Sequence, residues 1–341
     1  MESVLQELPA ALLPWYGENK RDLPWRQSKT PYHIWLSEIM LQQTRVEAVK
    51  GYYARFLEKL PTISALAEAD EALLLKLWEG LGYYSRVRNL KKAAQVIQEK
   101  YHGVFPAEYH QVLALPGIGE YTAGAVFSIA FGEKTAAVDG NVLRVCSRLL
   151  ADDTPIDQPA LKKKVRLALE AIYPEEAGDF TQALMELGAT ICGPNRAPDC
   201  ENCPCKGFCR GYADGVAAGL PVKQAKKARR VEEKTVLILR CGEEFALCKR
   251  PEKGLLAGMW QFPETAGFLE LSQAVEAAGL PVTNVFRQTE KNHIFTHIEW
   301  KMRGFYMEVA EKGEHYVWLY SEQIRETAAL PKAFLQFWEE F

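Results

Sequence analysis

The sequence predicts a multidomain protein, in which an all-α N-terminal region is followed by a smaller α+β domain. In residues 1–210 apolar side chains recur at helical spacing, for example at Leu73, Leu77 and Leu81, and no alternating run is long enough for a sheet. From Thr235 onward, short apolar runs bounded by turn residues are typical of strands. A length of 341 residues agrees with about two domains. The change in pattern is therefore interpreted as a domain boundary.

Residues 211–231 separate the two patterns and are interpreted as a linker, because they are rich in small residues and then in lysine and arginine. Such a basic segment is more often a solvated stretch than a dedicated DNA clamp. The second domain is expected at 232–341. Its expected strands are 235–240, 245–250, 294–309 and 316–319, the first two forming a hairpin, and its expected helices are 272–278 and 332–341.

Composition excludes several classes of protein. Hydrophobic residues make up 48% of the chain and charged residues 25%, which are ordinary values for globular domains. The longest apolar stretch, at 123–131, is far shorter than the roughly 20 residues of a membrane-spanning helix. No secretory signal is visible at the N-terminus, so a cytoplasmic protein is expected. The net charge of −3 argues weakly against DNA binding, although phosphate binding depends on local charge.

Five of the eight cysteines lie between Cys192 and Cys209. Four of them follow the pattern C-x7-C-x2-C-x5-C, which is dense enough to indicate a metal site rather than disulfides. The spacing fits either a [4Fe-4S] cluster or tetrahedral zinc. Cys205 is a fifth thiol in the same segment, so an exchanged ligand stays open.

The run LPGIG at residues 115–119 precedes an apolar segment expected to be helical at 122–130. Gly117 and Gly119 are expected to permit a tight turn with positive φ. The amides at the following helix N-terminus would attract a phosphate without any lysine. The alternative is an ordinary turn between two helices.

Twenty residues beyond Gly119, Asp139 follows the apolar run Ala136-Ala137-Val138. An aspartate before a helix is usually an N-cap, but a carboxylate at the edge of an apolar segment also points to function. Together with the glycine turn and the cysteines, this motif resembles the helix–hairpin–helix DNA glycosylases that carry an iron–sulfur cluster, typified by endonuclease III. The resemblance implies that Asp139 is catalytic. It also implies a [4Fe-4S] cluster on Cys192, Cys200, Cys203 and Cys209, although the family's first interval is C-x6-C.

Bifunctional members of that family carry a lysine two residues after the second hairpin glycine, and its amine forms a Schiff base with the sugar. This chain has Tyr121 there, which predicts a monofunctional enzyme. Further similarity, to the glycosylases that remove adenine opposite 8-oxoguanine, is carried by LPWR at 23–26, SEIMLQQT at 37–44 and LGYYSR at 81–86.

Glu38 has the surroundings of a general acid. Thr30 and Pro31 are expected to start a helix on which Ile34, Trp35 and Leu41 flank this carboxyl. Apolar neighbours raise the pKa of a carboxyl, so that it can hold a proton near neutral pH. The family resemblance implies that Glu38 protonates adenine and then activates water. It also implies that Asp139, assisted by Tyr121 and Asn141, stabilises the positively charged sugar.

The resemblance also assigns binding roles. Trp25, Arg26 and Gln182 are expected at the adenine pocket, with Leu41, Gln43 and Tyr83 against the DNA stack and Gly117 and Gly119 at its backbone.

The second domain resembles Nudix domains, but residues 272–279 retain only Glu276 and Gly279 of the motif R-E-x-x-E-E-x-G. One carboxylate is too few for a Mg²⁺–pyrophosphate site, so recognition is expected rather than hydrolysis. The family contacts 8-oxoguanine through Phe-Ser-His, and the corresponding residues here are Phe295, Thr296 and His297.

These observations predict a monofunctional DNA glycosylase that hydrolyses the N-glycosidic bond of adenine opposite 8-oxoguanine or guanine. The expected partner is double-stranded DNA, bound by a monomer in the cytoplasm at the nucleoid. The alternatives are an endonuclease III-like glycosylase/lyase and a non-catalytic iron–sulfur DNA-binding protein.

Overall fold

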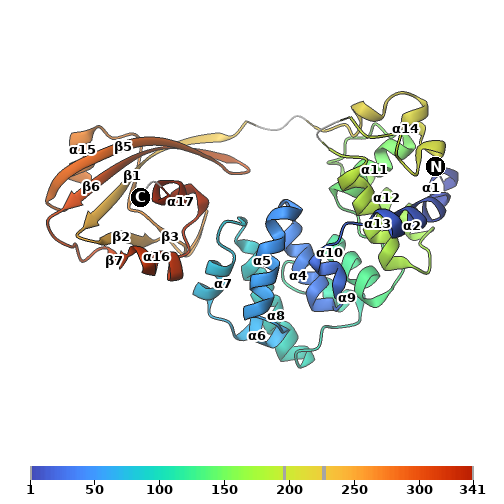
Figure 1. The fold of residues 1–341 in the computed structure, drawn as a ribbon, viewed down its shortest axis with the longest axis horizontal. Coiled ribbons are helices and arrows are strands. Elements are labelled where there is room, and N and C mark those ends of the chain that lie inside the picture. Colours follow the sequence, from blue (N-terminus) through green and yellow to red (C-terminus); the bar gives the residue numbers. More distant parts are fainter. Residues whose placement is uncertain (1, 195–196, 225–227, 340–341) are drawn as a thin grey trace. The chain divides into compact units, whose positions relative to one another are not determined.

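The computed structural model describes residues 2–194, 197–224 and 228–339, and its chain divides into two compact units (Figure 1). The first unit contains Met1–Glu68 and Asn89–Ala225, and the second contains Ala69–Arg88 and Lys226–Phe341. Part of the predicted linker, at 225–227, and the end of the predicted last helix, at 340–341, lie outside the described residues.

The first unit is helical. No strand occurs among the described residues before Arg230, which agrees with the predicted all-α region. Its helices are α1 (Glu2–Gln6), α2 (Leu8–Asn19), α3 (Pro24–Gln27), α4 (Pro31–Leu41), α5 (Val46–Lys59), α6 (Ile63–Glu68), α8 (Ser85–Tyr101, whose first turn belongs to the second unit), α9 (Tyr109–Leu113), α10 (Glu120–Val126), α11 (Gly140–Leu150), α12 (Pro159–Glu170), α13 (Ala177–Thr190) and α14 (Arg210–Ala213). A π-helical turn, Phe127–Phe131, continues α10, and short 3-10 turns lie at Lys206–Phe208 and Ala217–Gly219.

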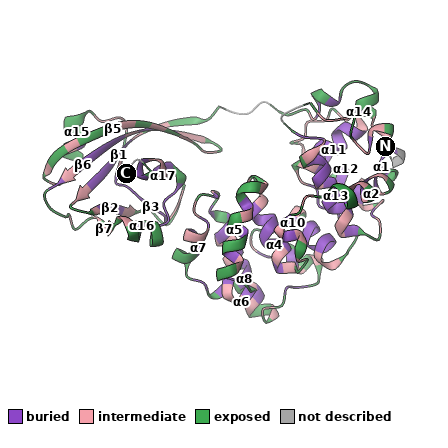
Figure 2. Ribbon diagram, viewed as in Figure 1, coloured by how far each residue is buried: buried purple, intermediate pink, exposed green. Residues whose placement is uncertain are grey.

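Helix α4 lies at the centre of this unit. As predicted, Thr30 caps it by accepting a hydrogen bond from the backbone N–H of His33, and Pro31 occupies its first turn. Its residues are buried on nearly every side, whereas α5 has a buried stripe at Val49, Tyr53 and Phe56 and an exposed opposite face (Figure 2). A helix that is apolar all round is a core helix. The position of Glu38 on α4 therefore places a carboxyl inside the protein.

A second layer of this unit is formed by α2, α11, α12 and α13. Its core contains Leu8 and Leu12 of α2, Val142 and Val145 of α11, and Leu184 of α13, all buried. The packing of α13 against both α2 and α11 brings the residues before α3 and the N-terminus of α11 to one region. That region contains the candidate site.

The second unit is built on a seven-stranded sheet (Figure 1). Its strands are β1 (Arg230–Cys241), β2 (Glu244–Lys249), β3 (Trp260–Gln261), β4 (Glu264–Ala266), β5 (Val282–Ile294), β6 (Ile298–Val309) and β7 (Val317–Tyr320). The order is β3-β2-β1-β6-β5, with β4 paired to β1 and β7 to β2, and β1 runs parallel to β6. Helices α15 (Leu271–Ala277), α16 (Ser321–Thr327) and α17 (Lys332–Trp338) complete the domain.

Both faces of this sheet are covered. Val236 and Ile238 of β1 pack toward Phe334 and Phe337 of α17, while the alternate residue Leu237 packs toward α15. A strand that is buried on both faces reads as a continuous apolar run, which explains why this strand was recognisable in the sequence.

The predicted hairpin is confirmed, because Cys241 pairs with Glu244 at the turn between β1 and β2. The predicted strand 294–309 is confirmed as β6 from Ile298 to Val309, but its predicted start at residue 294 is wrong. The chain turns back at residues 295–297, between β5 and β6, and β5 was missed altogether. Strand β5 lies at the sheet edge and is largely exposed, so its sequence is polar and lacks a clear alternation.

Residues 69–88, which include α7 (Glu71–Leu77), pack with the sheet domain. Lys76 donates hydrogen bonds to the carbonyls of Ile324 and Ala328 at 3.3 Å each, and Glu79 accepts one from the backbone N–H of Leu330 at 2.7 Å. Nothing in the local sequence pattern indicates this association. In the described part of the chain, no helix has both the length and the apolar character that crossing a membrane requires.

Candidate active site

A cavity of about 990 Å³ in the first unit is lined by all four predicted catalytic residues and by five of the predicted base- and DNA-binding residues. This volume is at the upper end of the range for small-molecule pockets, about 300–1,000 Å³. The predicted residues on its wall are Trp25, Arg26, Glu38, Leu41, Gln43, Tyr121, Asp139, Asn141 and Gln182. They come from segments up to 157 residues apart, so the fold assembles the site.

Glu38 is 5% exposed and accepts a hydrogen bond from the hydroxyl of Tyr121. Burial raises the pKa of Glu38 from 4.5 to about 7, although the Tyr121 hydrogen bond opposes the change. The nearby Asp139 raises this pKa and Arg26 lowers it. Glu38 is thus poised to carry a proton near neutral pH, as the sequence predicted. The hydroxyl of Tyr121 occupies one oxygen, which leaves the other available to a ligand in the cavity.

The raised pKa of Glu38 predicts a pH-dependent stability cost. In the unfolded protein the carboxyl ionises above about pH 4.5, whereas in the folded protein it keeps its proton until about pH 7. The stability given by the protonated form is therefore lost between these two values, and the difference corresponds to about 3 kcal/mol. Because glutamine cannot ionise, Glu38→Gln should raise the free energy of unfolding, relative to wild type, by about 3 kcal/mol more at pH 8 than at pH 4. Urea unfolding at both pH values measures this, and an equal change at both would contradict a buried acid.

Asp139 lies at the N-terminus of α11 and is its N-cap, with the backbone N–H of Val142 donating to Oδ1 at 2.8 Å. The side chain of Asn141 donates to Oδ2 at 2.7 Å. Burial raises the pKa of Asp139, but these donors and the charge of Arg144 favour its ionised form. The capping and functional interpretations are therefore compatible, because the cap fixes the carboxylate at the cavity wall.

A chain of contacts extends from Asp139 into the protein. Arg144 donates through Nη2 to Asn141 Oδ1 and to the carbonyl of Gly188, and through Nε to the carbonyl of Cys192, each at 2.8 Å. Since Asn141 holds Asp139, the buried guanidinium fixes the orientation of this Asp139–Asn141 pair. No sequence motif points to Arg144.

The approach of α10 to the segment before α11 brings Tyr121 and Asp139 to the same cavity. It depends on Gly124, where a Cβ atom would lie 2.5 Å from the carbonyl oxygen of Ala136. A larger residue at this position would separate the two elements, and with them Tyr121 and Asp139.

The glycine turn at 115–119 lies just before α10 and differs in one respect from the prediction. Gly117 has a φ of +77°, and a Cβ there would lie 2.6 Å from the Cβ of Asn89, so glycine is required. Gly119 was also expected to have positive φ, but it adopts an extended conformation with φ −107° and is the N-cap of α10. Open space adjoins Gly119, which suits close approach of a ligand to the backbone.

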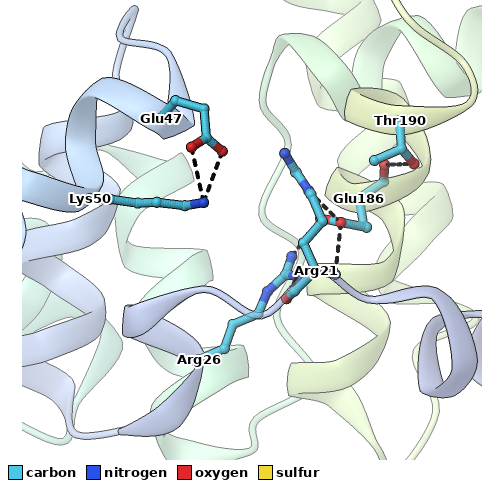
Figure 3. Close-up of polar contacts among 6 residues, drawn as sticks. All are labelled: Arg21, Arg26, Glu47, Lys50, Glu186 and Thr190. Atoms are coloured by element: carbon cyan, nitrogen blue, oxygen red, sulfur yellow. Dashed lines mark hydrogen bonds and ion pairs between the residues drawn. The ribbon is translucent and has the colours of Figure 1, made fainter.

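One cavity wall contains a charged cluster that the sequence did not reveal (Figure 3). Glu186, 1% exposed, binds Arg26 at 2.7 Å through Oε2 and Arg21 at 2.6 Å through Oε1. Glu186 lies one helical turn after Gln182 on α13, and this i,i+4 relation is the signal that could have found it. Gln182 donates to the carbonyl of Gly178 within the same helix.

Gln43 and Tyr83 both have positive φ, at 55° and 47°. This conformation is uncommon outside glycine and costs of order 1–3 kcal/mol, so it is typical of functional positions. Gln43 is at the cavity of the first unit, whereas Tyr83 belongs to the second unit.

In the second unit the hydroxyl of Tyr83 lies 3.3 Å from that of Thr296. Phe295 is packed edge-on against Trp300, and Thr296 and His297 are exposed at the tip of the β5–β6 hairpin. Phe295 thus anchors the hairpin while the next two residues face solvent. Of the predicted recognition residues, Thr296 is the one that contacts Tyr83.

The cysteines at 192, 200, 203, 205 and 209 line a second, small apolar space. Arg148 donates to Cys192 Sγ at 3.2 Å and to the carbonyl of Gly193 at 3.0 Å. A single zinc ion would draw its thiolates to about 2.3 Å around one centre. Among the described residues, no group of three or more His, Cys, Asp or Glu side chains is arranged to hold one metal ion.

Comparisons with known proteins agree with this architecture. Residues 36–174 match the model of the HhH-GPD superfamily base excision DNA repair proteins, and residues 235–340 match that of the NUDIX domain. A solved thermostable thymine-DNA glycosylase aligns with a TM-score of 0.56 and 30% identity, over 62% of this chain and 98% of that one.

Two curated relatives extend the similarity. The adenine DNA glycosylase of Arabidopsis thaliana is 37% identical over 88% of this chain, which spans only 57% of that relative's length. The adenine DNA glycosylase of Buchnera aphidicola (subspecies Baizongia pistaciae) is 34% identical, over 84% of this chain and 82% of the relative. With a helical core, a buried acid and a Nudix-like second domain in place, the chain belongs to the adenine DNA glycosylase family of the helix–hairpin–helix base excision repair superfamily.

Proposed function

We propose that this chain hydrolyses the N-glycosidic bond of adenine mispaired with 8-oxoguanine or guanine in double-stranded DNA, as a monofunctional, monomeric enzyme of base excision repair. The observation that carries the proposal is the buried Glu38, which is hydrogen-bonded to Tyr121 and lines the same cavity as Asp139. Two carboxyls with different protonation states are the arrangement that hydrolysis of a glycosidic bond needs.

The first step is proton transfer to a flipped-out adenine. The target base leaves the duplex and enters the cavity, since its reacting bond is inaccessible in the stack. Glu38 then donates its proton to N7 of adenine. The electron pair of the glycosidic bond moves to the protonated base, which departs as neutral adenine.

The second step is capture of the sugar cation by water. Asp139, held by Val142 and Asn141, stabilises the positive charge on the sugar. Glu38, now a carboxylate, accepts a proton as water adds to C1′, which restores the acid. The product is an abasic site. Tyr121 supplies a phenol rather than an amine, so no Schiff base forms and the strand is not cut.

Binding of the base and of the backbone falls to separate parts of the site. Trp25, Arg26 and Gln182 are proposed to surround the adenine, and Leu41, Gln43 and Tyr83 to contact the stack that it leaves. The backbone at Gly117 and Gly119 is proposed to approach a phosphate. Phe295, Thr296 and His297 are proposed to recognise 8-oxoguanine.

Residues 1–210 are proposed to carry catalysis and 232–341 lesion recognition, although residues 69–88 pack with the sheet domain. Of the expected linker 211–231, the part up to Ala225 belongs to the first compact unit. Helix α15 retains one carboxylate of the Nudix motif, the exposed Glu276, so pyrophosphate hydrolysis is not proposed. Action on chromosomal DNA would place the protein at the nucleoid in the cytoplasm.

Cys192, Cys200, Cys203 and Cys209 are proposed to hold a [4Fe-4S] cluster, with Cys205 as a buried neighbour. When bound, such a cluster cross-links the loop and can exchange single electrons. In the proposed mechanism the chain's own carboxyls carry the chemistry, and the loop supports Arg144 through the carbonyl of Cys192.

End-labelled duplexes with adenine opposite 8-oxoguanine, guanine or thymine test the proposal under single-turnover conditions. We expect strand breaks only after alkali, with the fastest reaction opposite 8-oxoguanine, a slower one opposite guanine and little opposite thymine. Breaks without alkali, together with efficient covalent trapping by borohydride, would instead indicate a glycosylase/lyase. Absence of excision from all three duplexes would favour a non-catalytic DNA-binding protein.

A further inference from the structure

Two carboxyls on the cavity wall have opposite electrostatic environments. Glu38 is buried with a phenol as its hydrogen-bond partner, whereas Glu186 is buried against two guanidinium groups. Burial alone would raise the pKa of Glu186, but the hydrogen bonds from Arg21 and Arg26 lower it below its ordinary value. Glu186 is therefore held as an anion, and the proposed mechanism assigns no step to it.

The contacts of Glu186 account for the position of Arg26. One nitrogen of Arg26 binds Glu186 at 2.7 Å, and another donates to the backbone carbonyl of Arg21 at 2.8 Å. The guanidinium also lies 5.3 Å above the ring of Tyr16. Arg21 donates hydrogen bonds to Glu186 from its backbone N–H and from two side-chain nitrogens, at 3.2, 2.6 and 2.9 Å. Arg26 is thus held on two nitrogens. It lines the cavity, and three of its five N–H donors are not used by these two contacts.

We propose that Glu186 is a positioning residue, which holds Arg26 in the wall of the base pocket so that its remaining N–H groups donate to N1 or N3 of the adenine. This inference rests on the proposed function. A guanidinium has no acceptor, so it can pair only with an unprotonated ring nitrogen, and Glu38 already takes N7. A fixed donor selects for such an acceptor more strongly than a mobile one, because no side-chain freedom is lost on binding.

Glu186 has a second consequence for the acid. Glu38 is faced by Tyr121 from α10, Asp139 from α11 and Arg26 from α3, and the positive charge of Arg26 lowers the pKa of Glu38. Glu186 neutralises that charge. Without it, Arg26 would act on Glu38 uncompensated, and the acid would lose its proton at lower pH.

The test combines variants with base analogues. Single-turnover excision is measured on duplexes containing adenine, 1-deazaadenine or 3-deazaadenine opposite 8-oxoguanine, for wild type and Glu186→Gln. The excision rate of the wild type should fall about tenfold or more when adenine is replaced by the analogue that lacks the paired nitrogen. This factor corresponds to the loss of a hydrogen bond to a charged group. In Glu186→Gln an amide N–H would face the guanidinium groups, so this variant should excise adenine more slowly than wild type. Its rate on the analogue should be no more than about threefold below its own rate on adenine. The ratio of the rates on adenine and on the analogue is measured with one protein sample, so partial unfolding of a variant does not change it.

Glu47→Gln is the matched control. Glu47 is exposed, pairs with Lys50 at 2.9 Å and acts on Arg21 only through space (Figure 3). It should retain the wild-type analogue ratios and pH profile, whereas the pH midpoint of Glu186→Gln should shift toward acid. Equal analogue penalties in wild type and Glu186→Gln, or no penalty in either, would overturn the inference while leaving the proposed function intact. If wild type does not excise adenine, the proposed function itself fails.

Discussion

Replacing Glu38 with glutamine is expected to lower the single-turnover rate of adenine release by about 10²–10⁴-fold, the usual contribution of a general acid. Glutamine has nearly the same shape, and its carbonyl can still accept the hydrogen bond from Tyr121. What it lacks is a proton to transfer to N7. The loss should therefore appear in the chemical step, measured as release of adenine from a duplex containing 8-oxoguanine.

DNA affinity is the control for this variant. Because Glu38 is buried in the cavity, the affinity of Glu38→Gln for the same duplex should stay within about threefold of wild type, measured by fluorescence anisotropy. An unchanged rate of adenine release would exclude Glu38 as the acid, and a parallel loss of affinity would point to a binding role.

Asp139→Asn is expected to lower the same rate by about 10²–10³-fold, the usual effect of removing one group that stabilises a developing charge. Asparagine is as good an N-cap as aspartate, so α11 should keep its first turn and the protein its fold. The negative charge that faces the sugar cation is lost, together with the acceptor for the side chain of Asn141. The pH midpoint of the residual activity should also move toward acid, because the charge of Asp139 raises the pKa of Glu38.

Asp70→Asn supplies a matched control, since Asp70 is also an N-cap aspartate and accepts from the backbone N–H of Ala72 at 2.9 Å. The same substitution there should leave adenine release unchanged. Similar losses in the two variants would mean that capping, and not charge at the reacting sugar, explains the effect of Asp139.

Local signals predicted the parts of the site that lie on one element. Thr30, Pro31 and the apolar neighbours of Glu38 are close in sequence, so the start of α4 and the burial of its carboxyl could be foreseen. The two-sided burial of β1 likewise left a continuous apolar run. Where the neighbours of a residue are close to it in sequence, its burial can be predicted from the sequence.

Contacts between distant segments could not be predicted in this way. Tyr121 and Glu38 are 83 residues apart, and Glu186 and Arg21 are 165 apart, so neither pair leaves a periodic signal. The family resemblance pointed to Tyr121 as a site residue, but it did not predict the hydrogen bond from Tyr121 to Glu38. The conformation of Gly119 was mistaken because a glycine is also tolerated where φ is negative, and β5 was missed because an exposed edge strand needs no apolar alternation.

The pH dependence of adenine release by the wild-type protein tests the central claim most directly. Single-turnover rates on a duplex with adenine opposite 8-oxoguanine should be measured from pH 5 to 9. If a buried, protonated Glu38 is the acid, the rate should fall as pH rises through about 7, where the pKa of this carboxyl lies, and decline about tenfold per pH unit above it. A rate that falls only below pH 5, or one that stays constant up to pH 9, would contradict the account.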